Sequence, residues 1–488
     1  MESIVRLTDI NLSNFKNVRN GSLSFINNRK NYKSSVLGLY GQNGSGKTAL
    51  IDALELLKNL ICSREIPSKF ADYVNVDSFY SEIDYAFDVK LNKTSFTVIY
   101  SVRFTKDATP EKNISDIQLE ESTYRVNIIK ESLKCQTPDK NGKLRMGVLI
   151  NTDSTEAFSP KSKYNLLTGG GKEVSTELLV SKKISQKMSK SFIFSRDLTS
   201  VIKKNCTEGT LGDNEREEAA HYLALINALI KYGISELFVI NTTASGIISL
   251  NAQPFMFKIK NTTKENSNTS GAIALPIENP AVIPEDLFAV ALEIVKNMNI
   301  VLDKIIPGLT IDIKNLGTQL LENNKIGIRI ELVSKKNSRE IPLKYESEGI
   351  KKIVSVLQLL VVVFNQESIT VAIDELDSGI FEYLLGELLR VISEKGKGQL
   401  IFTSHNLRPL ETIDRGFVAF TTTNPDNRYI RMTNIRDTNN LRDFYYRDII
   451  LREQDEEVYD TTDNAEITLA FMSYMGISQL KMETLKKK

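Results

Sequence analysis

The sequence predicts an α/β fold in which a mixed sheet carries a glycine-rich loop and is split by a mostly helical insertion. Three observations indicate this fold class. A glycine-rich motif lies between an apolar strand and an amphipathic helix near the N-terminus. Residues 75–130 are rich in β-branched and aromatic side chains, and apolar strands alternate with helices from residue 349 to 403. Such alternation is typical of a parallel sheet, whereas β-rich hairpins are antiparallel.

The N-terminal elements follow from changes in the hydrophobic period. Residues 4–25 alternate apolar and polar side chains and predict two short strands joined by a turn, and Ser35–Tyr40 predicts an apolar strand. From Lys47 onward the apolar positions recur at helical spacing, which predicts a helix. Segments such as FTVIYSVRF within 75–130 predict antiparallel hairpins.

The middle of the chain carries weaker signals. Residues 131–215 are polar and rich in Ser and Lys, which predicts loops, and 260–271 predicts a further loop. Helical spacing returns at Glu217–Tyr232 and at Glu285–Lys304. Because no heptad pattern is sustained, we expect no long coiled coil.

The C-terminal third predicts a strand, helix, strand, helix, strand series. The successive segments are a strand over 326–333, a helix from Gly349, a strand at Ile369–Ile373, a helix at Leu384–Ile392 and a strand at Gln399–Thr403. These strands are short and apolar and are separated by helices, so we expect them to lie parallel in one sheet.

Length and composition narrow the class of protein. The 488 residues exceed the size at which one hydrophobic core usually grows, so we expect two lobes or a large insertion. The 62 Lys and Arg residues balance 61 Asp and Glu residues, which argues against a positive electrostatic potential over the whole surface of the kind that attracts nucleic acid. The three separated cysteines fit no metal-ligand spacing. Without a signal-like start or a membrane-length apolar run, a cytoplasmic location is expected.

The strongest functional signal is the segment 41–48, Gly-Gln-Asn-Gly-Ser-Gly-Lys-Thr, which satisfies the motif G-x-x-x-x-G-K-[ST] between a strand and a helix. Its glycines let backbone N–H groups turn toward phosphate oxygens at the positive end of the following helix. The lysine would reach the β- and γ-phosphates, and the threonine hydroxyl would bind Mg²⁺. The predicted binding residues are Gly41, Asn43, Gly44, Ser45, Gly46, Lys47 and Thr48.

A second signal is a pair of acids at the end of the apolar strand Ile369–Ile373. Asp374 would hold the metal and Glu375 would polarise the attacking water as general base. Taken alone, two acids after a strand are equally compatible with a solvated turn. Together with the P-loop they predict a catalytic site for phosphoryl transfer.

The motifs around these acids resemble those of ABC-type ATPases. The order Asp374-Glu375-Leu-Asp377-Ser-Gly, a helix, a strand and Thr403-Ser-His405-Asn is similar to their Walker B, D-loop and switch histidine. Residues 345–352, Tyr-Glu-Ser-Glu-Gly-Ile-Lys-Lys, resemble their signature motif. The S-x-G form of this signature is that of ATPases related to the OLD (overcoming lysogenization defect) family and of ATPase subunits of anti-phage defence systems.

The resemblance covers about residues 1–105 and 285–425 and implies an ABC/SMC-type head that uses ATP and Mg²⁺. In that family two heads sandwich two ATP molecules, which implies a homodimer or higher homo-oligomer. Ser347 and Gly349 would then meet the γ-phosphate on another subunit, Asp377 would lie near the junction, and His405 would contact the γ-phosphate. Alternative interpretations are a helix start without a ligand for residues 347–349 and a packed core histidine for His405.

Four parts of the chain are expected from these motifs. They are the N-terminal part of the head with Walker A (1–130), an insertion of loops and helices (131–310), the C-terminal part of the head with the signature, Walker B and switch histidine (311–425), and a C-terminal extension (426–488). Phe15 and Lys16 match a nucleotide-contacting position of SMC-like heads only weakly. Gln118 is a guess for the Q-loop glutamine, and His221 is expected in the core or on the surface of a helix.

The function implied by the resemblance is a nucleotide-driven assembly switch that controls a separate effector, such as a nuclease, in anti-phage defence, with no membrane involved. One alternative is an ATPase of DNA repair or chromosome maintenance that binds DNA directly, for which Arg442, Arg447, Arg452 and Lys486–Lys488 are candidates. Another is an OLD-type ATPase that works with a nuclease. The acidic run 455–463 lacks the strand-end placement of a metal site and is expected to be a loop.

Overall fold

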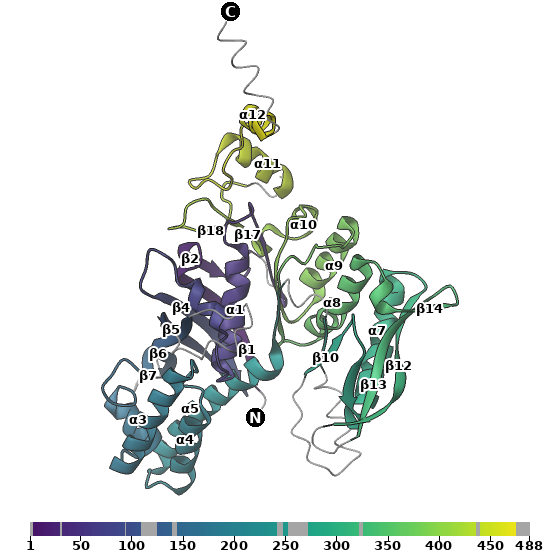
Figure 1. Cartoon of the computed structure of the whole chain (residues 1–488). Coiled ribbons are helices and arrows are strands. Elements are labelled where there is room, and N and C mark those ends of the chain that lie inside the picture. The colour runs from purple at the N-terminus through teal and green to yellow at the C-terminus, as the bar shows by residue number, and fades with distance from the viewer. Residues whose placement is uncertain are drawn as a thin grey trace, which may run out of the picture.

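The computed structural model describes residues 3–29, 32–92, 94–108, 124–138, 144–241, 247–251, 272–321, 326–435 and 440–474. In Figure 1 two lobes flank a central sheet, and the C-terminal extension rises from the end of the molecule opposite the free ends of the lobes. The α/β fold class with a mixed sheet is confirmed. The longest described helix has 21 residues, so the expectation of no long coiled coil is confirmed for the described part of the chain.

The central sheet has six strands in the order β18-β17-β3-β16-β15-β8. Its bounds are β3 Ser35–Tyr40, β8 Leu237–Ile240, β15 Thr370–Ile373, β16 Gln399–Thr403, β17 Val418–Thr421 and β18 Tyr429–Ile430. All neighbours are parallel except β17 and β18. The predicted strands at 35–40, 369–373 and 399–403 are confirmed, whereas β8 was not expected. Since the carboxyl ends of parallel strands meet at one edge, the residues that follow β3, β15, β16 and β17 converge there.

The N-terminal lobe contains a six-stranded antiparallel sheet in the order β2-β1-β4-β5-β6-β7. Its bounds are β1 Ser3–Phe15, β2 Val18–Ser24, β4 Ser81–Leu91, β5 Thr94–Ala108, β6 Tyr124–Pro138 and β7 Leu144–Asn151. The two strands expected over 4–25 and the hairpins expected over 75–130 are confirmed. β6 runs across the expected boundary at residue 130.

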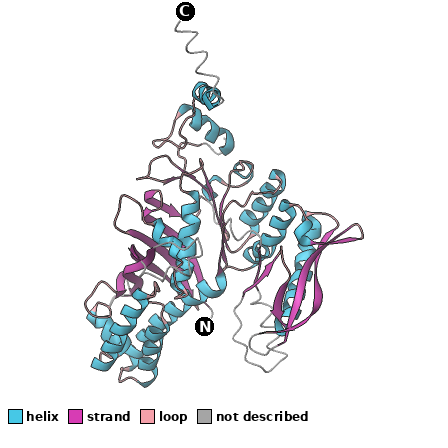
Figure 2. Cartoon of the chain, viewed as in Figure 1, coloured by secondary structure: helices cyan, strands magenta, loops and turns pink. Residues whose placement is uncertain are grey.

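Helices complete this lobe. They are α1 Lys47–Ile61, α2 Lys161–Thr168, α3 Lys172–Lys187, α4 Arg196–Glu208 and α5 Asp213–Lys231, with short turns at η1 Ser68–Tyr73 and η3 Tyr232–Glu236. Figure 2 shows the helical end of the lobe beyond its strands. The helices predicted from Lys47 and at Glu217–Tyr232 are confirmed, but the loops predicted over 131–215 are wrong. In α3, for example, Leu178 is buried while Val180 and Ile184 are exposed, so its amphipathic pattern is weak in sequence.

The second lobe packs helices between the central sheet and a small antiparallel sheet. Its elements are α7 Glu285–Ile305, α8 Glu348–Asn365, α9 Glu382–Lys395, the sheet strands β11 Ala281–Pro284, β12 Leu309–Leu320, β13 Ile326–Lys336 and β14 Arg339–Pro342, the pair β9 Ile247–Asn251 and β10 Ala272–Pro276, and the turn η5 Leu343–Tyr345. The helices and the strand expected in this region are confirmed. The loop predicted at 260–271 lies outside the described residues.

Two hydrophobic cores lie on opposite faces of the central sheet. In β3, Leu37 and Leu39 belong to the core of the N-terminal lobe, whereas Val36 and Tyr40 belong to the core shared with α7, α8 and α9. Successive side chains of a strand point to opposite faces, so one sheet serves both cores. The two lobes expected from the chain length are present.

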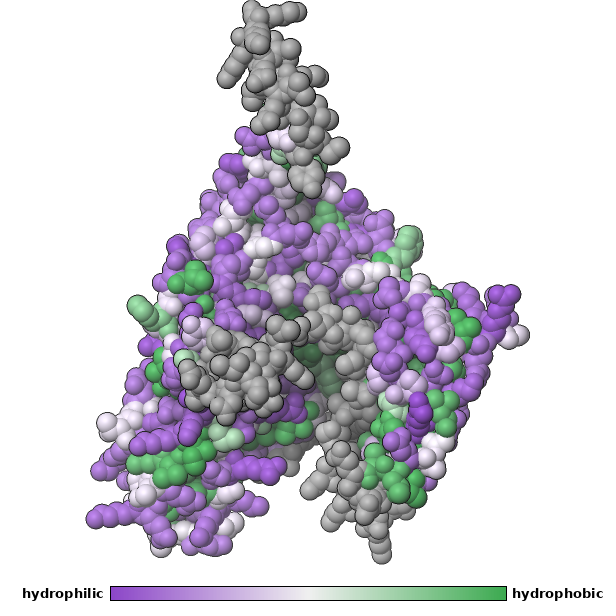
Figure 3. All heavy atoms as spheres, in the orientation of Figure 1, coloured by the Kyte–Doolittle hydropathy of each residue, from purple (hydrophilic) through white to green (hydrophobic). Residues whose placement is uncertain are grey.

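The C-terminal extension contains β18, α11 Leu441–Leu451 and α12 Asn464–Tyr474, and it follows α10 Pro409–Thr412, η6 Arg415–Phe417 and β17. The face seen in Figure 3 is mostly hydrophilic with scattered hydrophobic patches. Among the described helices, none has the length and apolar character needed to cross a bilayer. The division of the chain into four parts stays a prediction.

Candidate functional site

The predicted P-loop connects the end of β3 to the start of α1. Gly46 has a φ of 95°, in the left-handed region that favours glycine, and it is the residue directly before α1. At Gly41 a Cβ atom would lie 1.8 Å from Oγ1 of Thr421, so only glycine fits between the loop and β17. The loop therefore presents the N-terminus of α1 at the shared edge of the sheet, as anion binding requires.

The P-loop lysine lies within electrostatic reach of the acids of the second motif. Lys47 is buried, and its Nζ donates hydrogen bonds to the carbonyl oxygens of Gly41 at 2.8 Å and Gln42 at 2.9 Å. Burial lowers the pKa of Lys47, and the negative charges of Asp374, Glu375 and Asp377 oppose that shift. The structure thus brings the lysine and the predicted catalytic acids together. Thr48 is exposed beside them.

Two residues far along the chain and one that precedes the P-loop support it by hydrogen bonds. Oγ1 of Thr421 lies 2.5 Å from Oγ of Ser45, and the Tyr429 hydroxyl donates to the Gly46 carbonyl at 2.9 Å. The Asn17 side-chain amide donates to the Gly44 carbonyl. We did not predict these three supports. Thr421 ends an apolar strand and could have been found by that signal, whereas Tyr429 and Asn17 carry no sequence pattern that indicates a role.

Asp374 and Glu375 follow β15 as predicted. Asp374 is 1% exposed, and its Oδ1 accepts a hydrogen bond from the Thr403 hydroxyl at 2.5 Å. The Glu375 N–H donates to the same hydroxyl oxygen at 2.8 Å. Glu375 has a φ of 47°, a left-handed conformation that is uncommon for a residue other than glycine. The two acids are therefore tied to the end of the neighbouring strand.

Asp377 and His405 are joined through the backbone. Oδ2 of Asp377 accepts hydrogen bonds from the N–H groups of His405 at 3.0 Å and Asn406 at 2.9 Å. Its Oδ1 is buried without a hydrogen-bond donor among the described residues. The His405 residue is exposed at the end of β16. The carboxylate that we expected near a subunit junction thus also holds the switch-histidine loop of its own chain.

The signature residues lie at the start of α8. Ser347 caps this helix, and its Oγ accepts a hydrogen bond from the Ile350 N–H at 3.4 Å. Ser347 is exposed, and a Cβ atom on Gly349 would lie 2.2 Å from the carbonyl oxygen of Gly379 in the D-loop. In the described part of the chain, no hydrogen bond or ion pair joins Ser347 or Gly349 to the P-loop.

Lys352 is a further member of the site that we did not predict. It lies one turn into α8 and is 6% exposed. Burial lowers the pKa of its ammonium group, and the negative charges of Asp374, Asp377 and Glu375 partly offset this effect. Two lysines, one from the P-loop and one from the signature helix, therefore lie within electrostatic reach of the same three carboxylates.

The residue types present fit magnesium. Among the described residues there is no group of three or more His, Cys, Asp or Glu side chains placed to hold a metal ion by themselves. Magnesium, however, is usually held by one or two carboxylates together with substrate phosphates and water. The Thr48 hydroxyl and the Asp374 carboxylate are the protein groups that would hold it beside a nucleotide.

The C-terminal extension also contacts the P-loop through a strap, which we define as residues 456–460. The Asp460 N–H donates a hydrogen bond to Oε1 of Gln42 at 2.9 Å. Two side-chain amides from the turn after β17, those of Asn424 and Asn427, each donate to the Glu456 carboxylate at 3.0 Å. The Glu456 carboxylate is therefore occupied by contacts within the chain, and the loop predicted over 455–463 is confirmed.

The weaker sequence hypotheses have mixed outcomes. Phe15 is fully buried in the core, and Lys16 forms an ion pair with Asp52 and lies over the Tyr73 ring. His221 lies in α5, as expected, and its ring centroid is 4.5 Å from that of Phe96. Gln118 lies outside the described residues.

The candidate DNA-binding arginines pair with acids at 2.7 Å, namely Arg442 with Glu411, Arg447 with Glu453 and Arg452 with Glu457.

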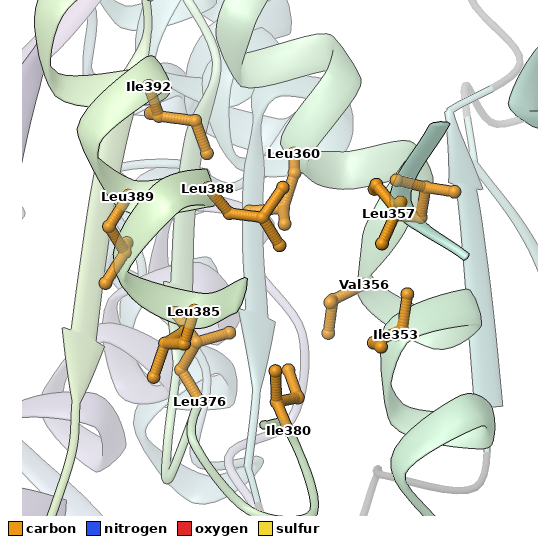
Figure 4. A pocket seen from close by; sticks show the side chains of 11 residues that line it. Ile353, Val356, Leu357, Leu360, Leu376, Ile380, Leu385, Leu388, Leu389 and Ile392 are labelled. Atoms are coloured by element: carbon orange, nitrogen blue, oxygen red, sulfur yellow. The ribbon is translucent and has the colours of Figure 1, made fainter. Parts of the chain in front are cut away.

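A small hollow between α8 and α9 has a different character from the site. Its lining is entirely aliphatic, as Figure 4 shows for side chains such as Val356, Leu360 and Leu389. It lacks the polar groups that a nucleotide needs, so we interpret it as imperfect packing beneath the signature helix.

Comparisons with known proteins give distant structural likeness only. No protein-family model matches the chain, and no curated protein matches its sequence. Similar solved structures include an Smc head domain with a coiled coil and joint derived from Pyrococcus yayanosii (10% identity, TM-score 0.39, 88% of this chain and 98% of that chain) and the SMC head domain from Thermotoga maritima (14%, 0.34, 88% and 99%). Another is the recombination mediator protein RecF with ATP (15%, 0.32, 82% and 92%).

Proposed function

We propose that this chain is an ABC/SMC-type ATPase that binds Mg-ATP and hydrolyses it between two copies of itself. The observation that carries the proposal is the convergence of Lys47 with Asp374 and Glu375 at the edge where β3, β15 and β16 end. A P-loop lysine opposite buried and half-buried acids is the arrangement that phosphoryl transfer to water requires.

The residues have separate roles in this proposal. The P-loop N–H groups and Lys47 bind the β- and γ-phosphates, and Glu375 takes a proton from the water that attacks the γ-phosphate. His405 lies at the end of β16, next to the acids, where it would contact the γ-phosphate. A bound Mg²⁺, held by Thr48 and Asp374, would neutralise phosphate charge during the reaction.

The signature supports a site built from two copies. Ser347 is exposed at the N-terminus of α8, and in the described part of the chain no bond joins it to the P-loop of its own copy, so its hydroxyl proton is available to a nucleotide on another copy. A two-fold dimer would form two such sites at once. ATP binding would then favour assembly, and hydrolysis would favour release.

The output of this switch is proposed to reach a separate effector, such as a nuclease subunit, in anti-phage defence, the setting that the sequence resemblance implies. Direct DNA binding through the C-terminal arginines is not favoured, because Arg442, Arg447 and Arg452 are each paired with a glutamate. Such surface pairs present little net positive charge to a phosphate backbone.

The test is the mass in solution of the Glu375→Gln protein with and without Mg-ATP. This change removes the general base but keeps the side-chain volume, so hydrolysis should fall about 10²- to 10⁴-fold while nucleotide still binds. We expect a shift to a dimer or larger species only with Mg-ATP. Lys47→Ala is the control, since it should lose nucleotide binding and show no shift. Parental hydrolysis by Glu375→Gln would refute the assigned base, and an unchanged mass would argue against nucleotide-driven assembly.

A further inference from the structure

Thr403 is the last residue of β16, and it lies beside the acids that end β15. The parallel register pairs Ile373 with Phe402, so the chain next brings Asp374 and Thr403 side by side. Thr403 is 1% exposed. A hydroxyl at this depth needs partners within the protein, because water does not reach it.

The Thr403 hydroxyl has a defined direction. The Glu375 N–H can only donate, so Oγ1 of Thr403 is the acceptor of their 2.8 Å hydrogen bond. The hydroxyl proton is then donated to Oδ1 of Asp374 at 2.5 Å. One side chain thus binds the carboxylate of the first acid and the backbone of the second.

Thr403 also supports an uncommon backbone conformation. Glu375 has a φ of 47°, and left-handed conformations of residues with a side chain persist only where the surroundings hold them. Thr403 holds this turn on both sides, because its hydroxyl accepts from the Glu375 N–H and its carbonyl accepts from the Leu376 N–H at 3.0 Å. The direction of the Glu375 side chain therefore depends on Thr403.

The second oxygen of Asp374 remains available. Its Oδ1 is occupied by Thr403, whereas Oδ2 has no hydrogen-bond donor among the described residues. A hydrogen bond to one oxygen of a metal-binding carboxylate fixes the orientation of the other. In addition, the residues after Thr403 lead directly to His405, whose N–H binds Asp377.

We propose that Thr403 is a positioning residue for ATP hydrolysis. Its hydroxyl orients Asp374 toward Mg²⁺ and fixes the backbone that aims Glu375 at the attacking water. This inference rests on the proposed function, because it assigns a role to the same site.

The experiment compares three variants with the parent protein. Thr403→Val keeps the side-chain shape and removes the hydroxyl, and Thr403→Ser restores the hydroxyl. Thr370→Val is the matched control. Thr370 is also fully buried on the same pair of strands, and its hydroxyl donates to Oε1 of Gln399 at 3.0 Å, but it lies at the opposite end of β15.

Two readouts separate positioning from general stability. Mn²⁺ binding to the nucleotide-bound protein, followed by electron paramagnetic resonance, reports on Asp374 without hydrolysis, and steady-state kinetics separates kcat from KM. Thr403→Val should weaken Mn²⁺ binding and lower kcat by about 10- to 100-fold each, as is usual for groups that orient metal ligands. KM for ATP should change by about twofold or less, since the phosphate contacts of the P-loop remain.

The conservative and control variants complete the test. Thr403→Ser should recover most of both quantities, and Thr370→Val should match the parent. Parental Mn²⁺ affinity and kcat in Thr403→Val, or equal losses in Thr370→Val, would overturn the positioning role. If instead the parent itself bound no Mg-ATP, the proposed function would fail first, and this inference with it.

Discussion

Two neighbouring lysines of the signature helix have opposite surroundings. Lys351 is paired with Glu348 and Glu278, which raise the pKa of its ammonium group. Lys352 is buried against the site, and burial lowers its pKa. The charged form is therefore favoured by folding at Lys351 and disfavoured at Lys352.

The substitution Lys352→Met should stabilise the protein at neutral pH. Because the pKa of Lys352 is lowered in the folded protein, folding costs free energy at any pH where this lysine is charged in the unfolded chain. That cost disappears as the pH rises to the ordinary pKa of lysine. Replacing the desolvated ammonium by an apolar side chain of similar length removes this cost of burial, so the free energy of unfolding should rise. The gain, measured by urea unfolding at pH 7, should shrink at pH 10. The matched change Lys351→Met should lower stability, and a stability loss in Lys352→Met at pH 7 would contradict the assignment.

At the scale of elements, the start of α8 is fixed by its contact with the D-loop. Gly349 lies so close to Gly379 that an added Cβ would approach the Gly379 carbonyl oxygen to 2.2 Å. Backbone atoms cannot move aside as a flexible side chain can. The signature helix and the turn after Walker B therefore keep one relative position.

Gly349→Ala should destabilise the protein although alanine is the better helix former by about 1 kcal/mol. The clash with Gly379 should outweigh that preference and cost about 1–3 kcal/mol in unfolding free energy. Gly171→Ala is the control, since Gly171 precedes α3 and nothing lies within 4 Å of its added Cβ. Urea unfolding of both variants tests this prediction. A Gly349→Ala protein as stable as the parent would show that the contact between α8 and the D-loop is not tight.

The sequence predicted elements best where the signal is local. The P-loop follows from eight consecutive residues, and Asp374 with Glu375 follows from one apolar strand. The support of Gly46 by Tyr429 spans 383 residues, and no local pattern encodes such a contact. The loops predicted before α5 failed for a different reason, because α3 exposes Val180 and Ile184 and so lacks a clear apolar face. Lys352 was missed because helical spacing alone does not show which face meets the acids.

At the scale of the whole molecule, the strap joins the last part of the chain to the first. Asp460 and Gln42 are 418 positions apart, yet the backbone of one binds the side chain of the other. The strap also carries negative charge beside the loop that is proposed to bind a triphosphate. Nucleotide binding should therefore be sensitive to residues of the C-terminal extension.

Glu456→Ala should loosen the strap and tighten ATP binding. The change removes one negative charge of the strap together with the acceptor of the Asn424 and Asn427 amides, and it leaves Asp460 held to the P-loop by its N–H bond to Gln42 alone. Relief of one repulsion in a water-like environment is worth about 0.5 kcal/mol, or a two- to threefold lower Kd. Titration with a fluorescent ATP analogue at low and high salt measures this, and the effect should fade with salt. Glu453→Ala, which removes only the pair with Arg447, should leave Kd unchanged; weaker binding in Glu456→Ala would mean that the strap assists the nucleotide.

The shared central sheet has a consequence for how the molecule melts. Leu37 and Leu39 of β3 point into one core, and Val36 and Tyr40 of the same strand point into the other. If heat loosened either core, one face of the central strands would be exposed to water, although the opposite face of the same strands still forms part of the other core. The two lobes therefore share one sheet and have no boundary at which they could be separated. A fragment that contained only one lobe would expose a full apolar face of this sheet to water.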